Sequence, residues 1–349
     1  MDAVELIDIL TQIRGVSGEE TAVSERIAQL CAPFSEQPVR TDHFHNVICT
    51  IRPPKEGEPH LLLEAHLDEI GFMVSSIADD GLLRVVPCGG VDRRLQPASP
   101  VLVWGKPQTP VPGVVGYLPP SLDDPQHPTP KADEMVVDIG YSSKEKVKTL
   151  VSPGDRITAD METIRLQGTR VTGKALDNRS GCAAVLLAGE MIAACRDRLR
   201  CGVTLLFGSM EEVGSVGTRS AAYDISPTHA IAVDVSFSAT HDMSPQKYTG
   251  KLGDGPMIGY SPVLSKDLSR YLEKQARKNS IPCQTEIMGG RTGTDADAIA
   301  IIRGGVKTGL LSIPQRYMHT PVEVIDTEDV RQTAMLMLFY AYDLGGGVL

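Results

Sequence analysis

An apolar segment that ends in two adjacent carboxylates is the feature that most constrains the fold of this chain. Residues 203–210 read VTLLFGSM, and Glu211 and Glu212 follow directly. A continuous apolar run of this length is typical of a strand that is covered on both faces of a sheet. In α/β sheets of this kind, sites form outside the carboxyl ends of the strands. We therefore expect the two acids to lie in a site at the carboxyl edge of the sheet, where a cation offsets the repulsion between their charges.

Two further apolar segments end in the same way. Residues 61–65 (LLLEA) precede His66 and Asp68, and residues 228–233 (THAIAV) precede Asp234. Side chains alternate along a strand, so His66 and Asp68 are expected to point the same way, with Asp68 accepting the second imidazole N–H. A single histidine at a strand end is more often structural, and a single acid there is often a turn residue. The convergence of three such ends is the stronger indication of a site.

Two more residues are candidates for the same site. Asp177 precedes an Ala- and Leu-rich helix predicted over 182–196, either as a plain N-cap or as a carboxylate that bridges two cations. His319 lies in a loop after a strand predicted over 307–313. Histidines and carboxylates without paired cysteines suit Zn²⁺, Co²⁺ or Mn²⁺. Their long, irregular spacing indicates ligands that come from different strands of one sheet.

The residue pattern between the strand predicted over 61–65 and the strand predicted over 203–210 indicates an inserted domain. Residues 70–165 are rich in Gly, Pro and Val and form short alternating runs, which are typical of a small β domain. The predicted fold is α/β, with a mixed, largely parallel, doubly wound sheet formed by residues 1–69 and 166–349 and a barrel-like β insert. The proline-rich segment 121–134 is predicted to be an exposed loop.

Helix-start patterns add three local predictions. Ser17 or Thr21 is expected to cap a helix over 22–30. Asp326 is expected to begin the last helix, with Asp329 completing a capping box.

Composition excludes several classes of function. The formal charge of −10 argues against a nucleic-acid binder and is compatible with attraction of cationic groups such as the amino end of a peptide. The apolar runs are far shorter than the roughly 18 residues that span a membrane. Seven cysteines without a C-x-x-C pattern favour reduced thiols, and no secretory signal is visible, so a cytoplasmic location is expected.

Six segments, in order along the chain, carry a resemblance to one family. They are 65–71 (AHLDEIG), 173–181 (GKALDNRSG), 211–214 (EEVG), 233–235 (VDV), 293–296 (GTDA) and 316–323 (RYMHTPVE). Together they make the chain resemble the tetrahedral aminopeptidase family, dinuclear metallopeptidases also labelled cellulase M or glutamyl aminopeptidase. The resemblance implies a zinc-peptidase-like catalytic domain, and an insert that mediates dimer contacts, with dimers building a tetrahedral dodecamer.

The resemblance also implies roles for the candidate residues in removing N-terminal residues from peptides. Two divalent ions per subunit are implied, Zn²⁺ or Co²⁺ before Mn²⁺. The implied ligands are Asp177 as the bridge, His66 and Asp234 for one ion, and Glu212 and His319 for the other. Glu211 is then the general base, and Asp68 orients His66.

Several positions depart from the family pattern and leave the substrate open. They are Met210, the stretch 215–221, Asp297 and Lys307. A deacylase or amidase acting on blocked peptides or small amides is the main alternative. An endoglucanase would use paired carboxylates but leave His66 and His319 without a role, and aromatic residues that could stack on sugars make up only 5% of the chain.

Overall fold

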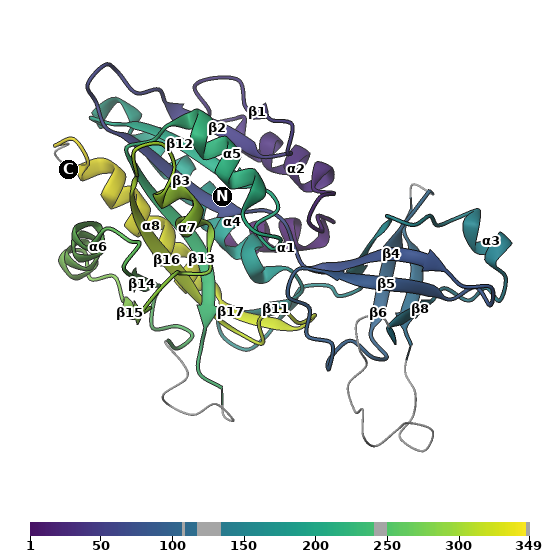
Figure 1. The fold of residues 1–349 in the computed structure, drawn as a ribbon. Coiled ribbons are helices and arrows are strands. Elements are labelled where there is room, and N and C mark those ends of the chain that lie inside the picture. The colour runs from purple at the N-terminus through teal and green to yellow at the C-terminus, as the bar shows by residue number, and fades with distance from the viewer. Residues whose placement is uncertain (107–108, 117–133, 241–249, 347–349) are drawn as a thin grey trace.

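The chain folds into a large α/β unit and a smaller closed β-barrel that stands beside it (Figure 1). The computed structural model describes residues 1–106, 109–116, 134–240 and 250–346. The predicted fold class, a mixed sheet with an inserted barrel, is confirmed.

Four parallel strands form the centre of the large sheet. Their spatial order is β12 (Gly202–Gly208), β3 (His60–His66), β13 (His229–Phe237) and β16 (Lys307–Arg316). The first of these in the chain, β3, lies between two strands that come much later. The direction in which strands are added therefore reverses at β3, and such a switch point opens a crevice at the carboxyl ends of the strands.

Antiparallel strands extend both sides of this parallel centre. Beside β12 lies the hairpin of β1 (Arg40–Thr41) and β2 (Val47–Arg52). Beyond β16 follow β17 (Glu323–Asp326), β11 (Arg170–Gly173) and β10 (Ile164–Arg165). The strand β14 (Met257–Tyr260) pairs with β16 and with β15 (Gln284–Ile287).

Helices cover both faces of the large sheet because the central strands are apolar on both faces. Leu61 and Leu63 of β3 belong to one buried cluster, whereas Leu62 belongs to another, as the two-residue period of a strand requires. The first cluster includes α1 (Ala3–Gln12), α2 (Thr21–Cys31), α4 (Leu176–Ala194), α6 (Lys266–Lys278) and α8 (Thr327–Asp343). The second includes α5 (Val216–Ile225) and α7 (Asp295–Ala300).

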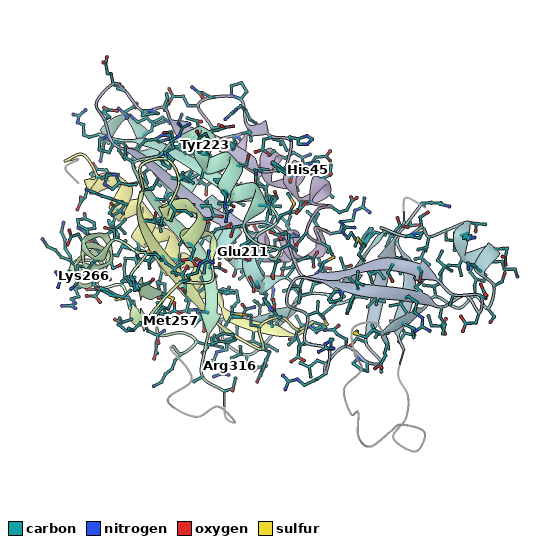
Figure 2. The ribbon with its side chains drawn as sticks, in the orientation of Figure 1. His45, Glu211, Tyr223, Met257, Lys266 and Arg316 are labelled. Carbon is teal, nitrogen blue, oxygen red and sulfur yellow. The ribbon has the colours of Figure 1, made fainter. Side chains whose placement is uncertain are left out.

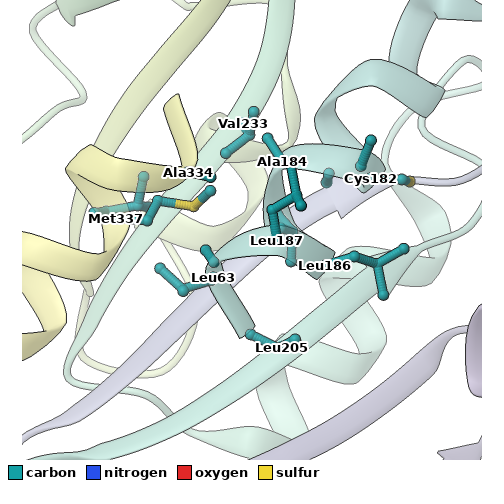
Figure 3. Close-up of a cluster of buried hydrophobic side chains, with 14 of the residues drawn as sticks. Leu63, Cys182, Ala184, Leu186, Leu187, Leu205, Val233, Ala334 and Met337 are labelled. Carbon is teal, nitrogen blue, oxygen red and sulfur yellow. The ribbon is translucent and has the colours of Figure 1, made fainter. Parts of the chain in front are cut away.

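The helix α4 fixes the edge of the sheet where the site lies. Its apolar side chains Cys182, Ala184 and Leu187 are buried against β3, β12, β13 and α8 (Figure 3). Burying an apolar side chain contributes roughly 1.5–3 kcal/mol, so this long helix is held firmly. Its first residues are therefore presented at a fixed position beside the ends of the strands.

The barrel closes around a core of its own. Its strands are β4 (Gly71–Ile77), β5 (Leu83–Cys88), β6 (Pro100–Trp104), β7 (Val111–Val115), β8 (Val136–Asp138) and β9 (Arg156–Ala159), paired in the order β4-β5-β8-β7-β6-β9. Phe72, Val85, Val103 and Ile157 are among its buried residues, and the short helix α3 (Lys144–Lys148) adds Val147.

The boundaries of the insert at 70 and 165 stay predictions, and β10 pairs within the large sheet. Of the predicted loop 121–134, residues 121–133 lie outside the described residues. Within the described part of the chain, no helix is long and apolar enough to cross a membrane.

Two of the predicted helix caps are wrong. Asp326 caps α8 by accepting the Glu328 N–H, but the carboxylate of Asp329 accepts the N–H groups of Gly253 and Gly255 instead of returning to the cap. An aspartate side chain is one methylene shorter than the Glu that usually completes a capping box. The helix α2 has no side-chain cap, and the Ser17 hydroxyl donates to Asp68 instead.

Candidate metal centre

Two groups of potential metal ligands share one carboxylate at the carboxyl edge of the sheet. His66, Asp177 and Asp234 form one group, and Asp177, Glu212 and His319 form the other. Within each group the ligand atoms lie within 4.8 Å of one another. The structure therefore brings together all five residues that the resemblance implies as ligands, and their roles stay predictions.

The parallel register explains how residues far apart in the sequence meet. His66 is the last residue of β3, and its register partner on β12 is Gly208, three residues before Glu211. Glu211 therefore lies just beyond the end of the strand beside His66 (Figure 2). Asp234 lies inside β13 and not at its end, because β13 goes on pairing with β16 as far as Phe237. The prediction that this strand ends at Asp234 is wrong.

Asp177 holds the central position of the cluster. Its Oδ1 lies 3.2 Å from Nε2 of His66, and its Oδ2 lies 3.3 Å from Nε2 of His319. Asp177 has non-helical backbone angles, so the regular part of α4 begins after it. Its Oδ1 has no hydrogen-bond partner among the described residues and its Oδ2 faces His319, so its carboxylate does not act as a plain N-cap. The backbone N–H of Asp177 donates to Oε2 of Glu323 at 3.0 Å. Each carboxylate oxygen of Asp177 thus faces a different histidine.

The His66 half of the cluster is deeply buried and belongs entirely to the large unit. Nε2 of His66 lies 3.7 Å from Asp234 Oδ1, and its Nδ1 lies 3.4 Å from Asp68 Oδ1. Asp68 is fully buried and accepts the backbone N–H groups of Glu211 and Glu212 and the hydroxyl of Ser17. Asp68 thus connects the position of His66 to the turn that carries both glutamates.

The His319 half is more open and is shared with the barrel. The side chain of His319 is 30% exposed, compared with 2% for His66. Its Nε2 lies 3.6 Å from Glu212 Oε1, and its Nδ1 lies 2.9 Å from the carbonyl oxygen of Gly90. The backbone N–H of His319 donates to Oε1 of Glu323 at 2.9 Å. One buried carboxyl group, that of Glu323, therefore holds the backbones of both Asp177 and His319.

The electrostatics of the metal-free chain favour a bound cation. Burial raises the pKa of Glu211 to about 9, and the charges of Asp234 and other acids add to this rise. Burial likewise raises the pKa of Glu212 to about 8 and that of Asp234 to about 6, and the charge of Asp177 contributes to both. Buried acids this close together are stable only when protons or cations neutralise them.

Asp177 behaves in the opposite way. Burial acts to raise its pKa, but hydrogen bonding and charge interactions with His319 and His66 outweigh burial and hold the pKa below its usual value. Its Oδ1 is buried without a hydrogen-bond partner among the described residues. An ionised carboxylate between two histidines, with one oxygen lacking a hydrogen-bond partner, fits a divalent cation such as Zn²⁺, Co²⁺ or Mn²⁺.

Several groups that support the cluster were not identified from the sequence. Glu323 lies in segment 316–323, where the residue pattern gives it no role, and Ser17 is a predicted helix cap that instead donates to Asp68. Gly90 contributes only a carbonyl oxygen, which has no pattern in the sequence. The buried Thr218 hydroxyl donates to Oδ2 of Asp295 at 2.6 Å and joins α5 to the first residue of α7, a contact that no sequence pattern indicates.

The fold and the cluster define a class, an α/β protein with a His and carboxylate cluster at the switch point of its sheet. A family model described as M42 glutamyl aminopeptidase matches residues 45–336, and the chain belongs to the M42 peptidase family. Peptidases of this family are metal-dependent, and the protein is a hydrolase that cleaves peptide bonds.

Individual relatives agree with this assignment over nearly the whole chain. The lysyl aminopeptidase of Pyrococcus furiosus is 33% identical over 340 residues, 95% of this chain and 94% of the relative. Aminopeptidase APDkam598 from the archaeon Desulfurococcus kamchatkensis has a similar structure, with a TM-score of 0.91, 34% identity, and coverage of 98% of this chain and 94% of that chain.

Two further solved structures bear on assembly and on the alternative activity. The TET1 peptidase of Pyrococcus horikoshii, described as able to assemble into a tetrahedron or a large octahedral shell, has a TM-score of 0.84 and 32% identity over 98% of this chain and 100% of that chain. A protein from Thermotoga maritima named endoglucanase has a TM-score of 0.77 and 29% identity over 96% of each chain.

Proposed function

We propose that the protein is an aminopeptidase that removes N-terminal residues from peptides with a dinuclear metal centre and Glu211 as general base. The observation that carries the proposal is the position of Asp177, whose two carboxylate oxygens face two different histidines. A carboxylate in that position is suited to bridge two ions. His66 and Asp234 would hold one ion, and Glu212 and His319 the other.

Bound divalent ions supply Lewis-acid chemistry, which polarises a carbonyl group and makes water a better nucleophile at neutral pH. The chain supplies the proton transfer. Glu211 belongs to neither ligand group and is half-buried beside them. Bound cations would counter the burial that raises its pKa, which leaves its carboxylate ionised and able to take a proton from the attacking water. Returning that proton to the leaving amine completes cleavage of the peptide bond. Asp68 fixes Glu211 through its backbone N–H, which limits the distance this base can move.

A free amino terminus suits this site better than a blocked one. The chain carries a formal charge of −10, and the buried acids at the sheet edge attract a cationic ammonium group. The deacylase alternative lacks this attraction because a blocked terminus is uncharged. The endoglucanase alternative, despite the name of one structural neighbour, gives no role to two histidines placed 3.2 and 3.3 Å from one carboxylate.

We also infer that the chain assembles through its barrel into dimers and then into a tetrahedral dodecamer. This inference is supported by the assembly named for the Pyrococcus horikoshii relative, which resembles this chain over almost its full length. Mass measurement of the native protein by light scattering tests it, and a monomer at micromolar concentration would contradict it.

The activity is tested with a panel of aminoacyl-anilides and short peptides, each with a free and an N-acylated terminus. We expect cleavage of the free series only, complete loss of activity in excess chelator, and recovery with Zn²⁺ or Co²⁺. Cleavage restricted to the acylated series would favour the deacylase. Full activity in excess chelator would remove the metal from the proposal.

A further inference from the structure

The barrel reaches the candidate metal centre through a turn that follows its second strand. Gly89 and Gly90 come directly after β5, which ends at Cys88. The carbonyl oxygen of Gly90 lies 2.9 Å from Nδ1 of His319, although 229 residues separate the two in the sequence. This is a contact between the inserted barrel and a candidate ligand of the large unit.

The chemistry of this contact determines which nitrogen of His319 faces the cluster. A carbonyl oxygen only accepts hydrogen bonds, so Nδ1 must carry the hydrogen. The opposite nitrogen, Nε2, then faces Oδ2 of Asp177 at 3.3 Å and Oε1 of Glu212 at 3.6 Å. A partner on one ring nitrogen sets which nitrogen binds a metal, and it also fixes the ring's orientation.

The turn approaches so closely that a side chain would not fit. A Cβ atom at Gly90 would lie 2.6 Å from Nδ1 and 2.8 Å from Cε1 of His319. A Cβ atom at Gly89, where φ is +78°, would lie 3.0 Å from Oε2 of Glu212 and 2.7 Å from Ile70. Both glycines thus lie against side chains at or beside the His319 half, and Gly90 lies against the histidine itself.

We propose that the Gly89–Gly90 turn of the barrel is a positioning element of the metal centre, which holds His319 through the Gly90 carbonyl so that Nε2 is directed at Asp177 and Glu212. The proposal rests on the proposed dinuclear site and assigns one half of that site a dependence on the barrel. Among the described residues, no barrel group makes such a contact with His66. Its Nδ1 instead lies 3.4 Å from Oδ1 of Asp68, which belongs to the large unit.

The variant Gly90→Ala tests the proposal, with Gly304→Ala as its matched control. Neither glycine has a positive φ, and a Cβ at Gly304 meets nothing within 4 Å, so only the first substitution displaces His319. Zn²⁺ is titrated by calorimetry into chelator-treated protein. We expect two ions in wild type and control, and in Gly90→Ala one unchanged ion and one bound about 10–100-fold more weakly.

A double-mutant cycle separates positioning from general damage. If Gly90 acts through His319, adding Gly90→Ala to His319→Gln changes the affinity for Zn²⁺ by less than about twofold. A further tenfold loss in that background, an unchanged Gly90→Ala, or equal weakening of both ions would overturn the proposal. Wild-type protein that binds no Zn²⁺ would overturn the proposed dinuclear function as well. If wild-type protein binds two ions and cleaves peptides, a negative result with Gly90→Ala contradicts only the role of the Gly89–Gly90 turn.

A measurement on wild type keeps the test valid even if Gly90→Ala does not fold. The ¹⁵N resonances of His319 in the Zn²⁺-loaded protein are assigned by their loss in His319→Gln. We expect a protonated Nδ1 and a metal-bound Nε2. Metal bound to Nδ1 would contradict the role of the Gly90 carbonyl.

Discussion

The two halves of the candidate centre share Asp177 but are built differently. The His66 half lies at the end of β3, is almost completely buried, and has a carboxylate of the same unit, Asp68, beside the outer nitrogen of its histidine. The His319 half lies in a loop, is partly exposed, and has a backbone carbonyl of the barrel in the equivalent place. The difference indicates that one half is rigid with the large sheet and the other depends on how the barrel sits.

The largest effect is expected from the residue that belongs to neither half. Glu211→Gln should leave metal binding near normal and lower turnover by about 10² to 10⁴-fold, because proton transfer is lost while the ligands remain. Steady-state kinetics together with metal analysis checks this. The control Glu212→Gln alters the His319 half and should instead lose metal. Normal turnover in Glu211→Gln would show that Glu211 is not the general base.

Asp68→Asn should weaken the His66 half more than the His319 half, because Asp68 lies 3.4 Å from Nδ1 of His66 and reaches Glu212 only through its backbone N–H. Asparagine has one acceptor oxygen where the carboxylate accepts N–H groups from Glu211 and Glu212 and the Ser17 hydroxyl. Zn²⁺ titration should show one ion bound about 10–100-fold more weakly. Asp329→Asn is the control, because that carboxylate also holds two backbone N–H groups but lies on α8. Equal weakening of both ions would show that the halves are not independent.

The two ends of β3 offer a comparison of histidine environments. Burial lowers the pKa of His60 from 6.5 to about 4, whereas Asp177, Asp234 and Asp68 raise the pKa of His66 against the effect of burial. His60 is thus protonated in the unfolded chain at a pH where it is neutral in the fold. Its contribution to stability is complete above pH 6.5 and is lost as pH falls from 6.5 to 4.

This loss should amount to about 2 kcal/mol. The value is smaller than the full pKa shift would give, because solvent screens the partly exposed ring. Urea unfolding of wild type and His60→Gln across that range measures it, because acids that titrate in both proteins cancel in the difference. Stability curves that stay parallel between pH 7 and pH 4 would show that His60 makes no such contribution.

The smallest effect is expected from Ser17→Ala. It removes one hydrogen bond of 2.6 Å to Asp68 and leaves the carboxylate its other partners, so Zn²⁺ affinity should fall by about tenfold at most. Ser24→Ala on the neighbouring helix is the control, because its hydroxyl donates to the carbonyl of His45 and has no link to the centre. The two variants should lose similar stability, and only Ser17→Ala should change metal binding in a calorimetric titration.

Features of this protein that depend on neighbouring residues can be predicted from the sequence. Apolar runs that end at His66 and before Glu211 predict the buried strands, and residue types with metal chemistry at those ends indicate candidate ligands. The short alternating runs and the Gly, Pro and Val content of residues 70–165 predict the inserted β domain. These patterns can be read because burial on both faces and strand periodicity act on neighbouring residues.

How those candidate ligands are supported becomes visible only in the folded chain. Asp177 had an equally good interpretation as an N-cap until the fold placed it between two histidines. The partners of Asp68 and His319 come from segments 51 and 229 residues away, and one of them, Gly90, contributes only a backbone oxygen. Every residue except proline carries the same carbonyl and N–H groups, so their placement depends on how the chain folds back on itself and not on which residue is present.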